Sequence, residues 1–96
     1  MDVVLVTKNG MVKRTSVEEF RKQGRGGGGI GAMSVADGDA VVGAVALSAQ
    51  TVMVVTAGGA AIRFAAEELR QMGRGAQGVR AIRLKDGDKV VAVISV

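Results

Sequence analysis

A repeat at a spacing of 49 residues constrains the fold of this chain more than any other feature of its sequence. Residues 3–47 align with residues 52–96 without a gap, and 18 of the 45 aligned positions are identical. A period of about 20 to 50 residues is typical of propellers and solenoids, in which neighbouring units bury each other's apolar faces. The linker, residues 48–51, is so short that the two copies must be neighbours. The chain is therefore predicted to be a single module of two repeats, residues 1–48 and 51–96.

Within each repeat, short apolar runs alternate with turn signals, as in a small antiparallel sheet. Asn9-Gly10 and Gly58-Gly59 favour hairpin turns, Asp-Gly-Asp turns begin at Asp37 and Asp86, and residues 16–21 suggest a capped turn of helix. Four strands per repeat predict an all-β fold with two four-stranded blades of a propeller-like assembly in each chain. The predicted strands are residues 3–7, 11–15, 30–35 and 40–47 in the first repeat, and 52–56, 60–64, 79–84 and 89–96 in the second.

A glycine-rich loop with one arginine, Arg25 or Arg74, lies between the second and third predicted strands of each repeat. Glycine permits sharp bends that bring backbone N–H groups close to a ligand, and arginine offers a fork of donors suited to phosphate. Two interpretations remain open, because the arginine could contact phosphate or could bond to backbone carbonyls of its own repeat. The loop-forming residues are Gln23, Gly24, Gly26, Gly27, Gly28, Gly29, Gly73, Gly75 and Gly78.

The formal net charge of +4 and the isoelectric point of about 10.1 favour a polyanionic partner. Eight of the nine acidic residues occupy matching turn or cap positions in the two repeats, so we interpret the acids as architectural and the bases as the binding surface. The chain lacks the aromatic platforms on which single-stranded nucleic acid stacks, so duplex DNA is the expected target. The candidate DNA-binding residues are Arg25, Arg74, Lys13, Arg14, Arg21, Lys22, Arg63, Arg70, Arg80 and Arg83, with Lys85 and Lys89 as further members of the basic footprint.

The composition argues against several other classes of protein. Without His, Cys or Tyr the chain has no usual general base, thiol nucleophile or DNA-cleaving tyrosine, so no enzyme activity is expected. The paired acids fall at turns and caps rather than in a metal site, and no Gly-Lys-Ser/Thr follows the glycine loops as a P-loop requires. We expect no cofactor, no metal, no small-molecule substrate and no membrane association, and a cytoplasmic location.

The spaced residues of both repeats resemble the blades of the C-terminal domain of the DNA gyrase A subunit, and the sister domain of the topoisomerase IV A subunit is also similar. In the first repeat the resemblance rests on Thr7, Gly10, Lys13, Arg14, Glu18, Glu19, Phe20, Gly24, Arg25, Gly26, Gly27, Gly29, Asp37, Gly38, Asp39, Val41 and Val42. In the second it rests on Met72, Gly73, Arg74, Gly75, Gln77, Gly78, Val79, Arg80, Leu84, Lys85, Gly87, Asp88, Val90 and Val91.

The resemblance implies a β-pinwheel in which each blade lends a strand to its neighbour. It also implies that duplex DNA is bent and wrapped on a basic outer rim, and that the protein is associated with the nucleoid. The gyrase signature Gln-Arg-Arg-Gly-Gly-Lys-Gly corresponds to residues 23–29, where Gly24 and Gly28 replace its first arginine and its lysine. Since two cations are missing, we expect binding and bending of DNA with little chiral wrapping. The alternative function is a structural or assembly module, a fragment or a reconstructed repeat, with little or no wrapping activity.

The number of repeats also predicts self-association. Family members resembling this chain carry about six blades, whereas two blades leave strand edges open at both ends. Head-to-tail contacts between identical chains form a closed ring when the rotation per chain divides the circle. We therefore expect a homo-oligomer, with a cyclic trimer favoured and a strand-exchanged dimer as the second choice.

Overall fold

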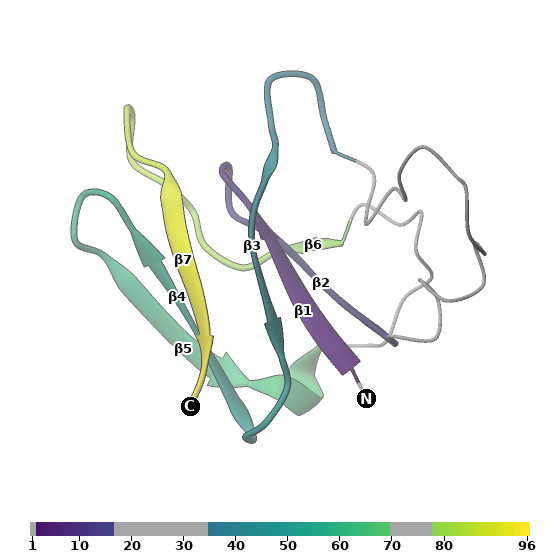
Figure 1. Ribbon diagram of the computed structural model, residues 1–96. Helices are drawn as coiled ribbons and strands as arrows, with labels where there is room; N and C mark the ends of the chain where they lie inside the picture. The colour runs from purple at the N-terminus through teal and green to yellow at the C-terminus, as the bar shows by residue number, and fades with distance from the viewer. Residues whose placement is uncertain (1, 17–34, 70–77) are drawn as a thin grey trace.

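The computed structural model describes residues 2–16, 35–69 and 78–96. These residues form two antiparallel sheets and one short 3-10 helix, η1 (Ala66–Glu68), as Figure 1 shows. The all-β prediction is therefore confirmed. The first sheet has the order β3 (Val41–Ala46), β1 (Asp2–Thr7), β2 (Met11–Ser16), β6 (Val79–Arg80), and the second has the order β5 (Ala61–Ala65), β4 (Thr51–Thr56), β7 (Val90–Ser95).

The hairpin turns form where the sequence places them. Gly10 has a φ of 95° and its N–H donates to the Thr7 carbonyl at 3.0 Å, while Gly59 has a φ of 94° and donates to the Thr56 carbonyl at 3.1 Å. Both φ values lie in the region that favours glycine. The two sheets also share an irregularity of register, which follows Val6 in β1 and Val55 in β4, 49 residues later. The second sheet therefore repeats the geometry of the first.

The first sheet gains its fourth strand from the second repeat. β6 pairs with β2, with Met11 opposite Arg80 and Val12 opposite Val79. The predicted strand of residues 79–84 is too long, because β6 ends at Arg80. The reason is the path of the chain: the Ala81 N–H donates to the Gly10 carbonyl at 2.8 Å, so the chain leaves β2 and passes over the first hairpin turn. We call residues 79–85 the crossing segment.

Other predicted elements are confirmed only in part. The helical turn predicted at residues 16–21 lies outside the described residues after Ser16, which ends β2. In the second repeat, η1 occupies the matching position, and the Ala65 N–H donates to the Glu68 carboxylate at 3.1 Å. The predicted strand at residues 30–35 lies outside the described residues except for Val35, which is in no strand. The second sheet has three strands in the described part of the chain.

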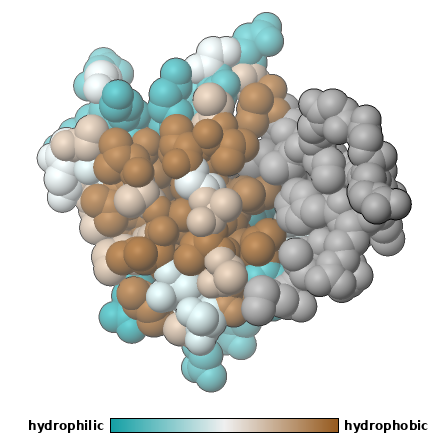
Figure 2. Space-filling model, viewed as in Figure 1, coloured by the Kyte–Doolittle hydropathy of each residue, from teal (hydrophilic) through white to brown (hydrophobic). Residues whose placement is uncertain are grey.

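The core is built mostly from valine and lies between the two sheets. Its fully buried members include Val4, Val6 and Val54, and Gly43 of β3 packs against Val93 of β7. A second group of apolar residues is exposed on β3 and β7, where Val42 is 40% exposed and Val91 is 47% exposed. Figure 2 shows apolar residues gathered in a broad band across this face of the molecule. Two repeats therefore leave an apolar face uncovered.

Candidate nucleic-acid interface

Most of the cations that the structure describes lie on the surface. Arg63, Arg80, Arg83, Lys85 and Lys89 are exposed, and Lys8 is half-buried. Three of them belong to the crossing segment, in which Ala81, Ile82 and Leu84 turn partly inward. The segment is held in place by its pairing with β2 and by the hydrogen bond to Gly10. It therefore displays Arg80, Arg83 and Lys85 from a backbone that both repeats anchor.

Lys13 is not on the surface, and its predicted place in the basic footprint is wrong in this respect. Its side chain is 0% exposed. The second repeat contributes to this burial, because β6 lies along β2 and an ideal Cβ placed on Gly78 would lie 3.2 Å from the Lys13 Cβ.

Arg14 joins the two repeats. Its Nε donates to the Asp2 carboxylate at 2.7 Å, and its guanidinium also donates to the Ala66 carbonyl in η1 at 3.0 Å. The Arg14 side chain is 28% exposed, and that of Asp2 is 16% exposed. The guanidinium is thus engaged in holding β2 against the second repeat. Sequence reasoning missed this role, because nothing local to Arg14 indicates an acceptor 52 residues away.

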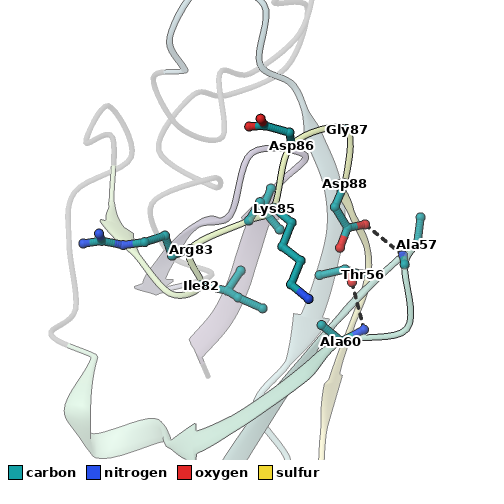
Figure 3. Close-up of a pocket in the computed structure, with 11 residues that line it drawn as sticks. Thr56, Ala57, Ala60, Ile82, Arg83, Lys85, Asp86, Gly87 and Asp88 are labelled. Carbon is teal, nitrogen blue, oxygen red and sulfur yellow. Dashed lines mark hydrogen bonds between the residues drawn. The ribbon is translucent and has the colours of Figure 1, made fainter.

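Two hollows lie beside the paired turns of the repeats. The one in Figure 3 has a volume of about 510 Å³ and lies between residues 56–60 and residues 82–88. Lys85 extends across it toward Ala60, whereas Arg83 points away. The matching hollow of the first repeat has a volume of about 250 Å³, and Arg80 of the crossing segment is part of its wall.

The paired turns are joined by aspartates at equivalent positions. The Asp39 carboxylate accepts hydrogen bonds from the Asn9 N–H at 2.9 Å and from the Ala40 N–H at 2.8 Å. Burial would raise the pKa of Asp39, but hydrogen bonds from the Thr7 hydroxyl and these two N–H groups, with the charge of Lys8, outweigh it and lower the pKa.

Asp88 does the same in the second repeat, accepting from the Gly58 and Lys89 N–H groups at 2.8 Å each. A hydrogen bond from the Thr56 hydroxyl is the largest cause of its lowered pKa, followed by the Gly58 N–H. The two carboxylates therefore act as architecture, as their position in turns predicts.

Gly78 is the one predicted loop residue that the structure describes. Its φ is 87°, and an ideal Cβ there would lie 2.2 Å from the Val12 carbonyl oxygen, so glycine is required where the crossing segment meets β2. The other predicted site residues lie outside the described residues: Gln23, Gly24, Gly26, Gly27, Gly28, Gly29, Gly73, Gly75, Arg21, Lys22, Arg25, Arg70 and Arg74. Five of the thirteen basic and two of the nine acidic residues fall there, so the described residues hold only +1 of the net charge of +4.

Comparison with known proteins explains the repeat. The family model described as "DNA gyrase C-terminal domain, beta-propeller" matches residues 2–48 and matches again at residues 50–96. The chain belongs to the DNA gyrase C-terminal domain family. Each copy of the 49-residue repeat is therefore one unit of this gyrase-type fold, and the exchange of β6 joins two successive units.

Individual relatives agree with the family. The chain is 51% identical over 43 residues to the DNA gyrase A subunit of Kosmotoga olearia and 54% identical over 39 residues to the DNA gyrase A subunit of Haloquadratum walsbyi. These matches cover 45% and 41% of the chain but only 5% of each relative. The chain thus corresponds to a small part of those proteins.

Solved structures match nearly the whole chain. A structure of the DNA gyrase A C-terminal domain aligns with a TM-score of 0.85 and 29% identity over 99% of this chain and 31% of that one. A C-terminal domain of DNA topoisomerase IV aligns with a TM-score of 0.82 and 27% identity over 96% of this chain and 28% of that one. The fold is thus that of the gyrase A β-pinwheel. Within the described residues there is neither a helix able to span a membrane nor a cluster of potential metal ligands.

Proposed function

We propose that the chain binds duplex DNA through the phosphate backbone, without sequence preference, and bends it. The observation that carries this proposal is the crossing segment, which presents Arg80, Arg83 and Lys85 on an anchored backbone. Cations on an anchored backbone bind a row of phosphates with a more favourable free energy than cations that move independently, because less conformational entropy is lost on binding. Membership of a DNA gyrase domain family supports the same function.

The glycine loops complete the proposed surface. Arg25 and Arg74 would contact phosphate together with loop N–H groups, and the neighbouring cations Arg21, Lys22 and Arg70 would extend the footprint. This placement agrees with the distribution of charge, because +3 of the net charge of +4 belongs to these two parts of the sequence. We also propose a module that has no catalytic activity of its own and works in the cytoplasm at the nucleoid.

The proposed mechanism needs more than one anchored segment. A segment bound to phosphates on one side of the duplex draws the DNA toward the protein, and a second segment at a fixed angle bends it. The two repeats would supply two such positions, one for each copy of the glycine loop and of the residues that follow it. Because the signature at residues 23–29 lacks two cations, bending would exceed chiral wrapping.

We further propose that the chain works as a homo-oligomer, with a trimer favoured over a strand-exchanged dimer. Three chains of two repeats would supply six repeats. The support is the apolar face on β3 and β7 that two repeats leave exposed. Closure would also place several crossing segments around one rim, and several contacts to one DNA molecule raise the apparent affinity.

A mobility shift on long duplex DNA at low salt tests the proposal against the alternative of a purely structural module, which predicts no shift. Arg83→Gln removes one proposed phosphate contact, and Lys8→Gln makes the same change in net charge at a half-buried turn residue outside the proposed surface. Losing one phosphate contact lowers the salt slope of binding by about 1. We expect that change for Arg83→Gln only. Equal slopes for both variants would refute the assignment of the crossing segment.

A further inference from the structure

The two repeats have the same sequence pattern but different environments at their ends. In the first repeat Gly10 of the hairpin turn is buried, and the Ile82 carbonyl oxygen lies 2.7 Å from an ideal Cβ on that glycine. In the second repeat Gly59 is exposed, and no atom of the described residues lies within 4 Å of its ideal Cβ. The same turn is thus covered by a neighbour in one repeat and uncovered in the other.

The outer strand of each sheet shows the same difference. β2 pairs with β6, and its Val12 is 0% exposed. β5 is the counterpart of β2 and pairs with β4 alone in the described part of the chain, and Ala61, at the position of Val12, is exposed. An open strand edge offers unpaired N–H and C=O groups to another strand. The larger hollow beside the second pair of turns, about 510 Å³ against about 250 Å³, lies next to this open edge and includes Ala60.

A second contact between the repeats involves Val90. The Val90 N–H donates to the Lys8 carbonyl of the first repeat at 2.8 Å, and Val90 is 1% exposed. The counterparts of this pair, 49 residues away, are Val41 and Ala57. Val41 is 40% exposed.

The backbone around Lys8 and Ala57 is the same in both repeats, because each N–H donates at 2.8 Å to the carbonyl of the residue before Val41 or Val90. Val41 and Ala57 are therefore equivalent in position to the two halves of the contact between Val90 and Lys8, and they lie on different repeats of the same chain.

We infer that two copies of this chain dock head-to-tail. Val41, in the first repeat of one copy, is placed on Ala57 and on the β5 edge in the second repeat of the other copy. We call Ala57, Gly59 and Ala61 the receiving end and Val41 the leading end. The contact would reproduce between chains the interface that joins the two repeats within one chain. This inference rests on the proposed self-association and adds which surfaces make it.

A second copy is the occupant that the observations favour. Val41 and Val90 are the same residue type, as are Gly10 and Gly59, so the two ends already carry the side chains of a working interface. All residues of β3 are apolar, and so are those of β5 apart from Arg63. Such a contact is heterologous, and repetition of one rotation closes a ring. Six repeats require three chains, with a mass of about 29 kDa, three times the 9.8 kDa of one chain.

The test blocks one end at a time. Val41→Glu places a charge on the leading end, and Ala61→Glu places a charge on the receiving end; both positions are exposed within one chain. Each variant keeps one end intact, so each alone should be a monomer of 9.8 kDa. Mixed at equal concentration, the two should form a one-to-one dimer of about 20 kDa, twice the mass of one chain, through their two intact ends. The matched control Ala36→Glu adds the same charge at an exposed turn and should leave the wild-type mass unchanged.

Light scattering at micromolar concentration separates the possible failures. A wild-type chain that stays at 9.8 kDa overturns both self-association and this interface. A wild-type oligomer whose mass neither single variant changes leaves self-association standing and overturns the interface. Variants that are monomeric alone and do not combine when mixed show that both ends are needed together in one contact, as in a two-fold symmetric dimer, and this result also overturns the head-to-tail inference. Formation of the mixed dimer shows at the same time that both variants fold.

Discussion

Replacing Gly78 by alanine should destabilise the protein far more than the same replacement at Gly87. The two glycines have similar backbone conformations, with φ values of 87° and 81°, so a side chain costs about 1–2 kcal/mol of local strain at either position. They differ in what the new Cβ meets. At Gly78 it would lie 2.2 Å from the Val12 carbonyl oxygen and 2.9 Å from the Val12 carbonyl carbon, whereas at Gly87 no described atom lies within 4 Å.

The clash at Gly78 involves backbone on both sides, so only a shift of β6 away from β2 can relieve it. That shift loses roughly two backbone hydrogen bonds at about 1 kcal/mol each. It also uncovers Val12, which is 0% exposed, at a further cost of about 1.5 kcal/mol. Gly78→Ala should therefore lower the free energy of unfolding by about 5 kcal/mol in total, a large part of the roughly 5–15 kcal/mol typical of a small domain.

Thermal unfolding followed by circular dichroism measures the difference. In a domain of this size, 1 kcal/mol corresponds to a shift in Tm of roughly 4–8 °C. The two variants differ by about 3.5 kcal/mol, so the Tm of Gly78→Ala should lie at least about 14 °C below that of Gly87→Ala. Similar Tm values for the two variants would refute the argument that the crossing segment is packed against β2 in solution.

Three further predictions follow from single contacts. Arg14→Gln should cost about 1–2 kcal/mol of stability, because it breaks the hydrogen bond to the Ala66 carbonyl across the repeats and the hydrogen bond to Asp2 within the first repeat. Arg63→Gln, at the exposed matching position, should change stability by less than about 0.5 kcal/mol in urea denaturation. Because the pKa values of Asp39 and Asp88 are lowered in the folded state, the unfolded state binds protons first as the pH falls. The stabilisation of the fold by the two carboxylates should be complete above about pH 5 and lost as the pH drops through their lowered folded pKa values. Asp39→Asn should flatten this dependence of folding stability on pH in urea titrations. In a relaxation assay with a nicking-closing enzyme, the protein should stabilise few supercoils, and a large change in linking number would show that the incomplete signature at residues 23–29 still supports wrapping.

The parts of the fold that the sequence predicts well are local. Asn9-Gly10 and Asp37-Gly38-Asp39 form turns because glycine adopts the positive φ that each turn requires and the aspartate accepts nearby N–H groups. The repeat of 49 residues likewise predicts two equivalent sheets, and their matching register irregularities confirm this.

The errors arise where one repeat acts on the other. The predicted strand of residues 79–84 is too long because its end depends on Gly10, a residue about 70 positions away that accepts the Ala81 N–H. The sequence groups Lys13 with the surface cations because it is basic, whereas the structure buries it in β2, a strand that β6 of the other repeat flanks. Strand exchange is a tertiary feature, and hydrophobic periodicity alone contains no information on it.

Whether the chain holds DNA by its phosphates is tested most directly by the salt dependence of binding. Fluorescence anisotropy with a long labelled duplex gives the association constant at a series of salt concentrations between about 50 and 200 mM. If roughly six to ten phosphates are engaged, the constant should fall by about 10³- to 10⁵-fold over this range, equally for duplexes of unrelated sequence. An association constant that does not change with salt, or that differs strongly between sequences, would contradict the account.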